Sequence, residues 1–293
     1  MTAVASRRAA SRPPARSRRY VLAPLLVGLL AAACLLAVYL VFVRSALGQA
    51  IDTAAMRGAD VHHPRVVAVL ERTLDGTTLA SLILVCVAAA AIGVVRRRVD
   101  LAIGAAAIVL GANLSAQLLK DHLDRPDLDN FPAPNSFPSG HTTAATSVAF
   151  ALVFALPHAV RGVVALAGSA YVAVIAVATV WAEWHRPSDT VAGLLLALAY
   201  GGVIAAAVRA RHRVQRGSTG RSTRVTTVVL SIVGALGALV GIVGMAAVAA
   251  NERVSPDLVS GRFAFLAGAA AIIAAVAAVF VIWIRLAAGD RSS

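Results

Sequence analysis

Two polar stretches carry the side chains in this chain that have the chemistry to handle a phosphate group. The first runs from Lys120 to His141, contains the single lysine of the chain, and ends in the sequence Pro-Ser-Gly-His. The second runs from Trp184 to Asp189 and holds a histidine and a carboxylate four residues apart. Polar loops of this length between apolar segments are more often functional than idle. We therefore expect the two stretches to meet in space.

The end of the first stretch directly precedes an apolar segment that should be a helix. Ser139 suits the N-cap, Gly140 lets the backbone approach a ligand, and the free N–H groups of the first turn attract an anion. The same residues also suit an ordinary loop-to-helix turn. Such a turn requires neither His141 nor the upstream cations Lys120 and Arg125, and ionisable groups at a membrane edge often mark a substrate path. The stretch therefore predicts an anion site.

The second stretch places His185 and Asp189 at positions i and i+4, across the expected start of a helix whose first turn suits Pro187. A carboxylate one turn away is able to accept the Nδ1–H of the imidazole, which leaves Nε2 as a nucleophile. A belt of Trp, His and Arg at the membrane interface accounts for the same residues without chemistry. The residues of this stretch alone leave both interpretations open.

The elements that must position these stretches are apolar helices. The 293-residue chain is 59% hydrophobic and 14% charged, against about 25% charged residues in soluble domains. Several apolar runs approach or exceed the roughly 20 residues that cross a bilayer as a helix. The sequence predicts an all-α, polytopic membrane bundle with spans near residues 20–43, 79–95, 101–119, 142–156, 163–182, 190–208, 225–249 and 263–284.

The net charge of +13 is explained by arginines that cluster beside the expected spans, as the positive-inside rule requires. Because no basic stripe with interleaved aromatic residues occurs, we expect no nucleic-acid partner. The arginines at 96–98 and 209–224, and a basic tail over 1–19 that should be disordered, mark the cytoplasmic side. We therefore expect a multi-pass protein of the cell membrane, with both termini cytoplasmic and both polar stretches extracytoplasmic.

Together the two stretches resemble the type 2 phosphatidic acid phosphatase family, whose members are membrane phosphatases related to the vanadium haloperoxidases. The family has three motifs, K-x6-RP, PSGH and SR-x5-H-x3-D. The second motif is complete at residues 138–141, and the H-x3-D part of the third is complete at His185 and Asp189. The resemblance covers about residues 45–210, so it implies a six-helix core like that of the family, followed by two additional transmembrane helices.

The sequence departs from the family motifs at two points. Four residues, not six, separate Lys120 from Arg125-Pro126. On a continuous helix this spacing would splay the two cations apart, whereas unwinding before Pro126 would let them meet. In the third motif Thr179 stands where the family has arginine, and Arg186 is a candidate substitute.

The resemblance implies a phosphatase that needs no metal and no cofactor. It implies that His185 attacks phosphorus to form a phosphohistidine, that Asp189 stabilises the imidazolium, and that His141 protonates the leaving group. The implied substrate is a lipid phosphate: phosphatidic acid, phosphatidylglycerol phosphate, or a polyprenyl phosphate or diphosphate. The residues that would hold the phosphate oxygens are Lys120, Arg125, Ser139, Gly140 and Arg186.

The expected organisation is a tail over 1–19, a catalytic transmembrane domain over 20–210, a basic linker over 211–224, two further helices over 225–285, and a tail over 286–293. Short amphipathic helices near 50–56 and 66–74 should lie at the membrane interface. One face of the seventh span should pack closely through four glycines spaced three or four residues apart: Gly234, Gly237, Gly241 and Gly244.

Other functions remain open at this point. A catalytically silent relative that binds lipid or a partner protein is the main alternative, motivated by the arginine missing at Thr179. A transporter is disfavoured because the spans lack deep charged residues. A metal site at His62-His63, or a magnesium site among the loop aspartates, is less favoured than a reading of those residues as surface or solvated loop groups. The loop aspartates are Asp121, Asp124, Asp127 and Asp129.

Overall fold

The computed structural model describes residues 15–59, 99–211, 221–254 and 259–287, and between 59 and 99 only residues 72, 87, 91 and 95. Within these ranges the regular structure is entirely helical, and six helices are long and apolar enough to cross a membrane. The expected all-α polytopic bundle is thereby confirmed. The elements are α1 (Ala15–Val38) with its π-helical continuation η1 (Tyr39–Val43), α2 (Ala46–Arg57), α5 (Val99–His122), α6 (Gly140–Ala155), α7 (His158–Trp181), α8 (Pro187–Arg211), α9 (Arg221–Val254) and α10 (Gly261–Ala287).

The helices follow the expected spans with differences at their ends. The helix α1 already begins at Ala15, inside the tail that was expected to be disordered. The helix α7 begins at His158, before the expected start at Val163 and directly after its N-cap Pro157. Proline is excluded from a helix interior, so Pro157 marks the boundary between α6 and α7. Apart from the single residues 72, 87, 91 and 95, the expected span over 79–95 and the expected short helix over 66–74 lie outside the described residues. The helix α6 has 16 residues and is shorter than the six long spans.

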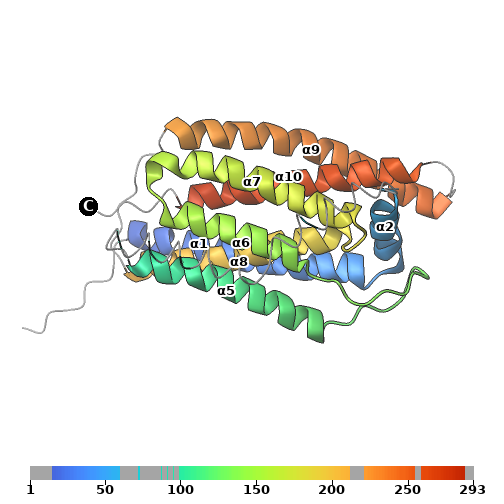
Figure 1. Cartoon of the computed structure of the whole chain (residues 1–293), viewed down its shortest axis with the longest axis horizontal. Coiled ribbons are helices and arrows are strands. Elements are labelled where there is room, and N and C mark those ends of the chain that lie inside the picture. The colour runs from blue at the N-terminus through green and yellow to red at the C-terminus, as the bar shows by residue number, and fades with distance from the viewer. Residues whose placement is uncertain are drawn as a thin grey trace, which may run out of the picture.

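The long helices run side by side, and α2 lies across one end of the bundle (Figure 1). At this end α5 and α7 finish and α6 and α8 begin, so the loop after α5 and the turn before α8 are brought to the same place (Figure 1). The alternating direction of consecutive helices therefore delivers both polar stretches to one end of the molecule, as the sequence predicts.

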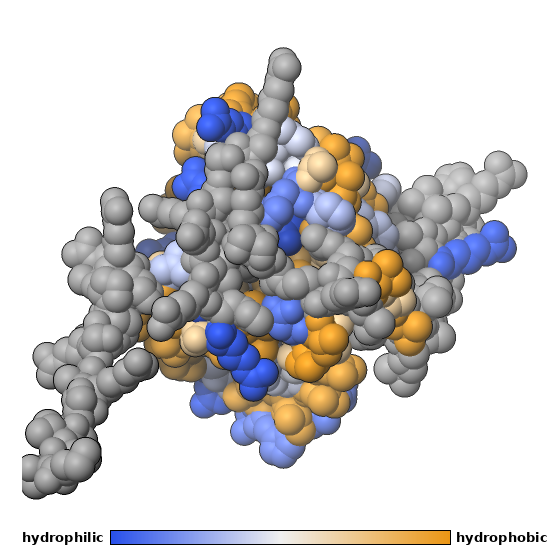
Figure 2. Space-filling model, turned by 90° about the vertical axis from the view of Figure 1, so that its left-hand side faces the viewer, coloured by the Kyte–Doolittle hydropathy of each residue, from blue (hydrophilic) through white to orange (hydrophobic). Residues whose placement is uncertain are grey.

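The opposite end of the bundle carries arginines that close the last turn of α10. The Nη1 atom of Arg161, at the start of α7, donates to the carbonyl oxygen of Ala287 at 2.6 Å. The Nη2 atom of Arg209, at the end of α8, donates to the carbonyl oxygen of Leu286. These carbonyls lack helical partners, and cations near a helix C-terminus are favourable. Figure 2 looks onto this end, where hydrophilic side chains lie among apolar ones.

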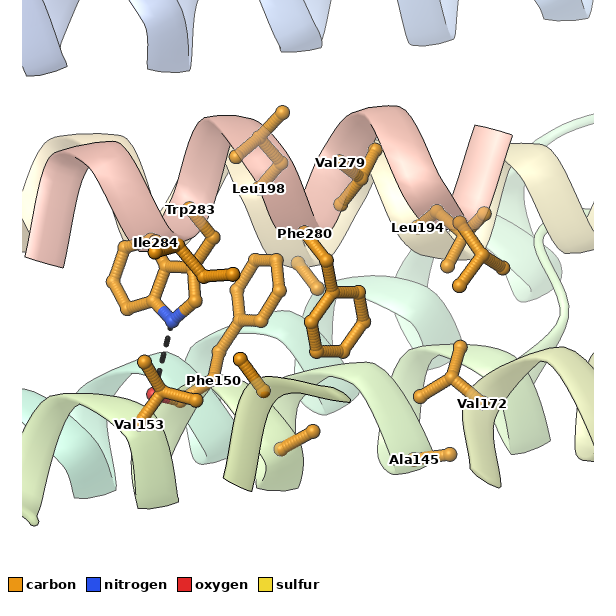
Figure 3. Close-up of a cluster of buried hydrophobic side chains, with 14 of the residues drawn as sticks. Ala145, Phe150, Val153, Val172, Leu194, Leu198, Val279, Phe280, Trp283 and Ile284 are labelled. Carbon is orange, nitrogen blue, oxygen red and sulfur yellow. Dashed lines mark hydrogen bonds between the residues drawn. The ribbon is translucent and has the colours of Figure 1, made fainter. Parts of the chain in front are cut away.

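The apolar core joins α10 to the helices that position the site. Trp283 stacks on Phe150 of α6 with ring centroids 4.6 Å apart, and its indole N–H donates to the carbonyl oxygen of Phe150 at 3.2 Å (Figure 3). Phe280 meets Phe150 edge to face at 5.3 Å. These rings pack with Leu194 and Leu198 of α8. The last helix is thus part of the central core and not a peripheral addition.

The helix α9 lies on the outside of α10 (Figure 1). A Cβ atom on Gly241 would lie 2.8 Å from the Cα of Ala271, and one on Gly244 would lie 2.5 Å from the Cβ of Ala267. Real Cβ atoms do not approach this closely, so only glycine permits this helix spacing. The predicted close packing along the glycine face is confirmed, and its partner is α10.

Candidate active site

The helix α5 ends at His122, before Arg125, so Lys120 and Arg125 do not share a continuous helix. The side chain of Asn135 folds the following loop back onto the helix end, because its Nδ2 donates to the carbonyl oxygens of Leu123 at 2.8 Å and Lys120 at 3.1 Å. A Cβ atom on Gly140 would lie 4.0 Å from Nζ of Lys120. The unwinding expected before Pro126 is present, and the lysine lies at the start of α6.

The start of α6 is built around Ser139. Its hydroxyl oxygen accepts a hydrogen bond from the backbone N–H of Thr142 at 3.3 Å, the N-cap interaction that the sequence predicts. Its own backbone N–H donates to the carbonyl oxygen of Asp189 at 2.8 Å. A Cβ atom on Gly193 would lie 2.9 Å from the carbonyl oxygen of Ser139, so α8 lies directly against this turn. The two motif segments are therefore joined through backbone, while a contact between the Ser139 hydroxyl and phosphate stays a prediction.

The turn between α7 and α8 presents His185. The backbone N–H groups of Trp184 and His185 both donate to the carbonyl oxygen of Thr179, at 3.0 and 3.2 Å. Glu183 has a φ of 58°, a left-handed conformation that is uncommon outside glycine and that reverses the chain here. The side chain of Thr179 is fully buried and donates to the carbonyl oxygen of Ala176 at 2.9 Å. The helix α7 therefore supplies no cation from this position, and the site must take its arginines from elsewhere.

The rings of the two histidines lie close together in an edge-to-face arrangement. The ring centroids of His141 and His185 lie 6.1 Å apart with an interplanar angle of 67°. Trp184 lies beside His141, with ring centroids 5.6 Å apart. The two histidines come from different helix starts and are 44 residues apart in the sequence (185 − 141). The expected meeting of the two polar stretches is thus realised around this histidine pair.

Asp189 is fully buried and is the centre of the polar network. Its Oδ1 accepts from Nη2 of Arg125 at 2.5 Å, and its Oδ2 accepts from the Ser136 hydroxyl at 2.6 Å and from the Arg186 backbone N–H at 3.0 Å. The Nδ1 atom of His185 lies 3.6 Å from Oδ2, beyond hydrogen-bond length. The predicted His–Asp pair is therefore assembled, but in this structure without the predicted hydrogen bond.

The two arginines of the site are both almost completely buried, with side chains 2% exposed. Besides the contact of Arg125 with Asp189, its Nε and Nη1 atoms are buried and find no hydrogen-bond partner in the described part of the chain. Arg125 and Arg186 both line a cavity of about 360 Å³. Because buried donors without partners are rare, these N–H groups are available to an anion.

Sequence reasoning missed the contribution of α2. The expected short helix near 50–56 is present, and its residues Gln49, Asp52 and Thr53 are buried and bonded to the site, a role that the sequence does not predict. Its position at the membrane interface stays a prediction. Burial, together with the nearby carboxylate of Asp189, raises the pKa of Asp52 to about 7. The available signal was the spacing of these polar residues, at i, i+3 and i+4 on one face of an otherwise largely apolar segment.

Asp129 corrects an expectation from the sequence. We had interpreted it as a solvated loop charge, but its side chain is 3% exposed. Its Oδ2 accepts from the Thr53 hydroxyl at 2.5 Å and lies 3.8 Å from Nη2 of Arg186. The physical reason is that burial of Arg186 requires a carboxylate nearby. The other three loop aspartates are exposed.

Metal ligands were considered at two places in the sequence. In the ranges that the structure describes, no group of three or more His, Cys, Asp or Glu side chains is arranged to hold a metal ion. The histidines at 62 and 63 lie outside those ranges. The cationic groups of the site, Lys120, Arg125 and Arg186, are of the kind that bind phosphate oxygens.

The fold and the site define a helical membrane protein with a polar, histidine-containing centre at one end of its bundle. Residues 101–213 match the PAP2 superfamily. Neither the search of curated proteins nor the search of solved structures returned a match. The matched segment runs from α5 through α8, and the match and the six long spans support a membrane phosphatase of the PAP2 type.

Proposed function

We propose that this protein is an integral membrane lipid phosphate phosphatase that works through a phosphohistidine. The observation that carries the proposal is the histidine pair, with ring centroids 6.1 Å apart, beside the start of α6 and the Lys120 ammonium group. A nucleophile and an acid on opposite sides of a small space are what an in-line phosphoryl transfer requires. The histidine pair lies in the segment that matches the PAP2 superfamily, and this match supports the same chemistry.

In the first step, Nε2 of His185 attacks phosphorus. The N–P bond forms while the bond from phosphorus to the lipid oxygen breaks, and His141 gives its proton to the leaving oxygen. In the second step, His141 takes a proton from water, the water oxygen attacks phosphorus, and the N–P bond breaks to release inorganic phosphate. Asp189 stabilises the imidazolium of His185, and catalytic hydrogen bonds such as this one often tighten only when substrate is bound.

Cationic and N–H groups hold the phosphate oxygens in both steps. The Lys120 ammonium group lies beside Gly140 at the start of α6, where the helix dipole and the Gly140 N–H favour an anion. The free Nε and Nη1 donors of Arg125 add a second cationic side. In this scheme Arg186 supplies the charge that the family draws from the position of Thr179, and Ser139 contributes its hydroxyl hydrogen. Fixed donors aimed at developing charge are the largest source of stabilisation in such reactions.

The position of the site favours an amphiphilic substrate. The polar centre lies at one end of a bundle whose flanks carry many exposed apolar side chains, among them Leu114, Leu118 and Val174. A lipid phosphate keeps its acyl or prenyl chains beside such flanks while its head group reaches the end of the bundle. Candidate substrates are phosphatidic acid, phosphatidylglycerol phosphate, and polyprenyl phosphates and diphosphates.

The activity is tested by phosphate release from this panel of lipids by purified protein in detergent. Wild type should release phosphate in the presence of EDTA and should be inhibited by vanadate, which mimics the transferring phosphoryl group. His185→Ala should abolish phosphate release. It should also abolish the phosphohistidine intermediate, which is detected as labelled protein when the lipid carries a labelled phosphate group. The matched control is His122→Ala, because His122 lies at the same end of the molecule but is exposed and bonds to the Leu118 carbonyl of its own helix.

The result that would overturn the proposal is phosphate release by wild type no greater than that by His185→Ala on every lipid. In that case a binding protein becomes the better interpretation. Two observations favour that second candidate: Thr179 replaces the family arginine, and Arg125 already contacts Asp189 at 2.5 Å. A lipid phosphate bound without turnover, measured by calorimetry, would establish it.

We further propose that the site faces away from the cytoplasm and that the protein lies in the plasma membrane with both termini inside. The end opposite the site carries Arg161, Arg209 and Arg211, and arginine-rich ends face the cytoplasm. Single cysteines introduced at Asp127 and at Arg211, in a chain without its native cysteines, would test this in intact cells. An impermeant thiol reagent should label only the first, and labelling of only the second would reverse the orientation.

A further inference from the structure

We propose that α2 is a positioning element of the active site, and that Gln49, Asp52 and Thr53 hold the histidine turn and the Arg125 loop in register. The inference rests on the proposed phosphatase function, but its geometry is independent of that function. These three residues form one face of α2 and are 1%, 0% and 8% exposed. None of the three belongs to the segment that matches the PAP2 superfamily, which begins at residue 101.

Gln49 fixes the loop that carries Arg125. Its Nε2 donates to the carbonyl oxygen of Pro126 at 2.7 Å, and its Oε1 accepts from the backbone N–H of Leu128 at 3.1 Å. The same amide also donates to the carbonyl oxygen of Val43, just before α2, at 2.7 Å. One buried side chain thereby ties the residue after Arg125 to the start of α2.

Asp52 and Thr53 hold the turn between His185 and Asp189 from both sides. The carboxylate of Asp52 accepts from both the backbone N–H, at 3.0 Å, and the hydroxyl of Ser188, the residue before Asp189. The hydroxyl of Thr53 accepts from Nε of Arg186, the residue after His185, at 2.8 Å. The same hydroxyl donates to Asp129. The two residues of α2 thus hydrogen-bond to both neighbours of Pro187. These bonds fix the turn that sets the distance between His185 and the Asp189 carboxylate.

The position of α2 is itself fixed by close backbone approaches. A Cβ atom on Gly48 would lie 1.9 Å from the carbonyl oxygen of Val41, and one on Gly58 would lie 1.9 Å from that of Gly261. A Cβ atom on Gly268 of α10 would lie 3.1 Å from both Ala55 of α2 and Pro187. The helix α10 therefore supports α2 and the histidine turn at the same glycine, so the two pack side by side against one fixed surface.

The test compares Thr53→Val with Thr53→Ser. Valine keeps the shape of threonine and removes the hydroxyl that bridges Arg186 and Asp129, whereas serine keeps that hydroxyl. The matched control is Thr227→Val in α9, whose hydroxyl only donates to the Thr223 carbonyl of its own helix at 2.8 Å. Each protein is assayed as the full chain in detergent for kcat and KM, and for the histidine ring signals by NMR, with the His185 signal assigned from its loss in His185→Ala.

A positioning role predicts that Thr53→Val lowers kcat about 10- to 100-fold with a smaller change in KM, since small displacements of reacting groups have effects of this size. It also predicts a shift in the His185 ring signal. Thr53→Ser should keep kcat within about threefold of wild type and should leave the His185 ring signal at its wild-type position. The Thr227→Val control should leave both unchanged.

The two arms separate the possible failures. If wild type releases no phosphate, the proposed function fails, and the His185 ring signal alone still decides whether α2 positions the turn. An unchanged ring signal in Thr53→Val, with or without activity, would overturn the inference. A ring signal displaced equally in Thr53→Val and Thr227→Val would overturn it too, because the effect would then be general loosening of the bundle.

Discussion

Two regions of the molecule, the α9–α10 helix pair and the site end of the bundle, are held together by different forces. The pair α9–α10 packs through glycine and alanine along most of its length, with each contact made by neighbours on a regular helical face. The site end is held by side-chain hydrogen bonds between residues far apart in the chain, from 53 positions for Ser136 with Asp189 to 136 positions for Asp52 with Ser188. The first region is apolar and periodic, and the second is polar and irregular.

This difference indicates which region of the molecule fixes the relative positions of its residues most tightly. Contacts between small residues allow two helices to approach closely, but they leave some freedom to slide or rotate because the attraction is spread over many weak contacts. A buried hydrogen bond fixes a donor and an acceptor within a few tenths of an ångström and is costly to leave unmade. We expect changes in α9–α10 to alter stability, and changes at the site end to alter chemistry.

The largest expected effect follows from Asp189→Asn. An asparagine keeps the shape but removes the charge that pairs with the buried Arg125, and it withdraws the carboxylate that we propose stabilises the His185 imidazolium. Phosphate release should fall by about 10³-fold or more, by analogy with loss of the carboxylate behind a catalytic histidine. The thermal midpoint should fall as well, because breaking a buried pair costs about 3–5 kcal/mol. Phosphate-release assays and thermal unfolding in detergent measure the two effects.

If Asp189→Asn loses stability but keeps the wild-type rate, the distinction between the two regions fails. Asp189 would then have only a structural role, like the glycines of α9. Serine at position 136 provides the milder companion. Ser136→Ala removes one of three hydrogen bonds to the Asp189 carboxylate and should produce a smaller loss of rate than Asp189→Asn.

The next effect is Gly241→Val in α9. A Cβ at this position would already lie 2.8 Å from the backbone of Ala271, so valine must push α9 away from α10. Overpacking of this kind costs about 1–3 kcal/mol, and the thermal midpoint should fall accordingly. The kcat/KM of the folded fraction and its pH profile should stay as in wild type, because none of the proposed catalytic or phosphate-binding residues lies in α9. A changed pH profile would show that the two regions are coupled.

The last expected effect is on the pH dependence of the free energy of unfolding, and it is tested with Asp52→Asn. Burial and the carboxylate of Asp189 raise the pKa of Asp52 to about 7 from 3.8, opposed by the Ser188 hydrogen bonds and by Arg125. The folded state therefore binds a proton that the unfolded state releases, so the stability from this proton is complete below pH 3.8 and is lost as pH rises towards 7. Asparagine mimics the protonated side chain and does not titrate.

The thermal midpoint of Asp52→Asn minus that of wild type should accordingly increase between pH 4 and pH 8 by about 2–4 °C for each kcal/mol lost by the wild type. Thermal unfolding in detergent across this pH range measures the difference. A difference that is constant or that shrinks with pH would mean that Asp52 stays ionised when folded. In that case the Ser188 hydrogen bonds and Arg125 outweigh burial.

The fold and much of the site were accessible from the sequence. Long apolar runs require helices across a bilayer, and the described spans follow them. The glycine spacing in α9 correctly predicted close helix packing, because the periodicity of a helix is local. The N-cap at Ser139 and the unwinding before Pro126 were also predictable, since both depend on residues a few positions apart. The extracytoplasmic orientation stays a prediction.

Sequence by itself determined the all-helical membrane bundle, the two polar stretches and the identity of the residues in the histidine pair. Only the tertiary structure decided that Asp189 bonds Arg125 and Ser136, that Asp129 is buried against Thr53, and that α10 belongs to the core. The tertiary structure alone placed α2 against the site. The physical reason is that periodicity and capping act over one or two helical turns, whereas these partners lie far apart in the chain and meet only because the helices alternate in direction.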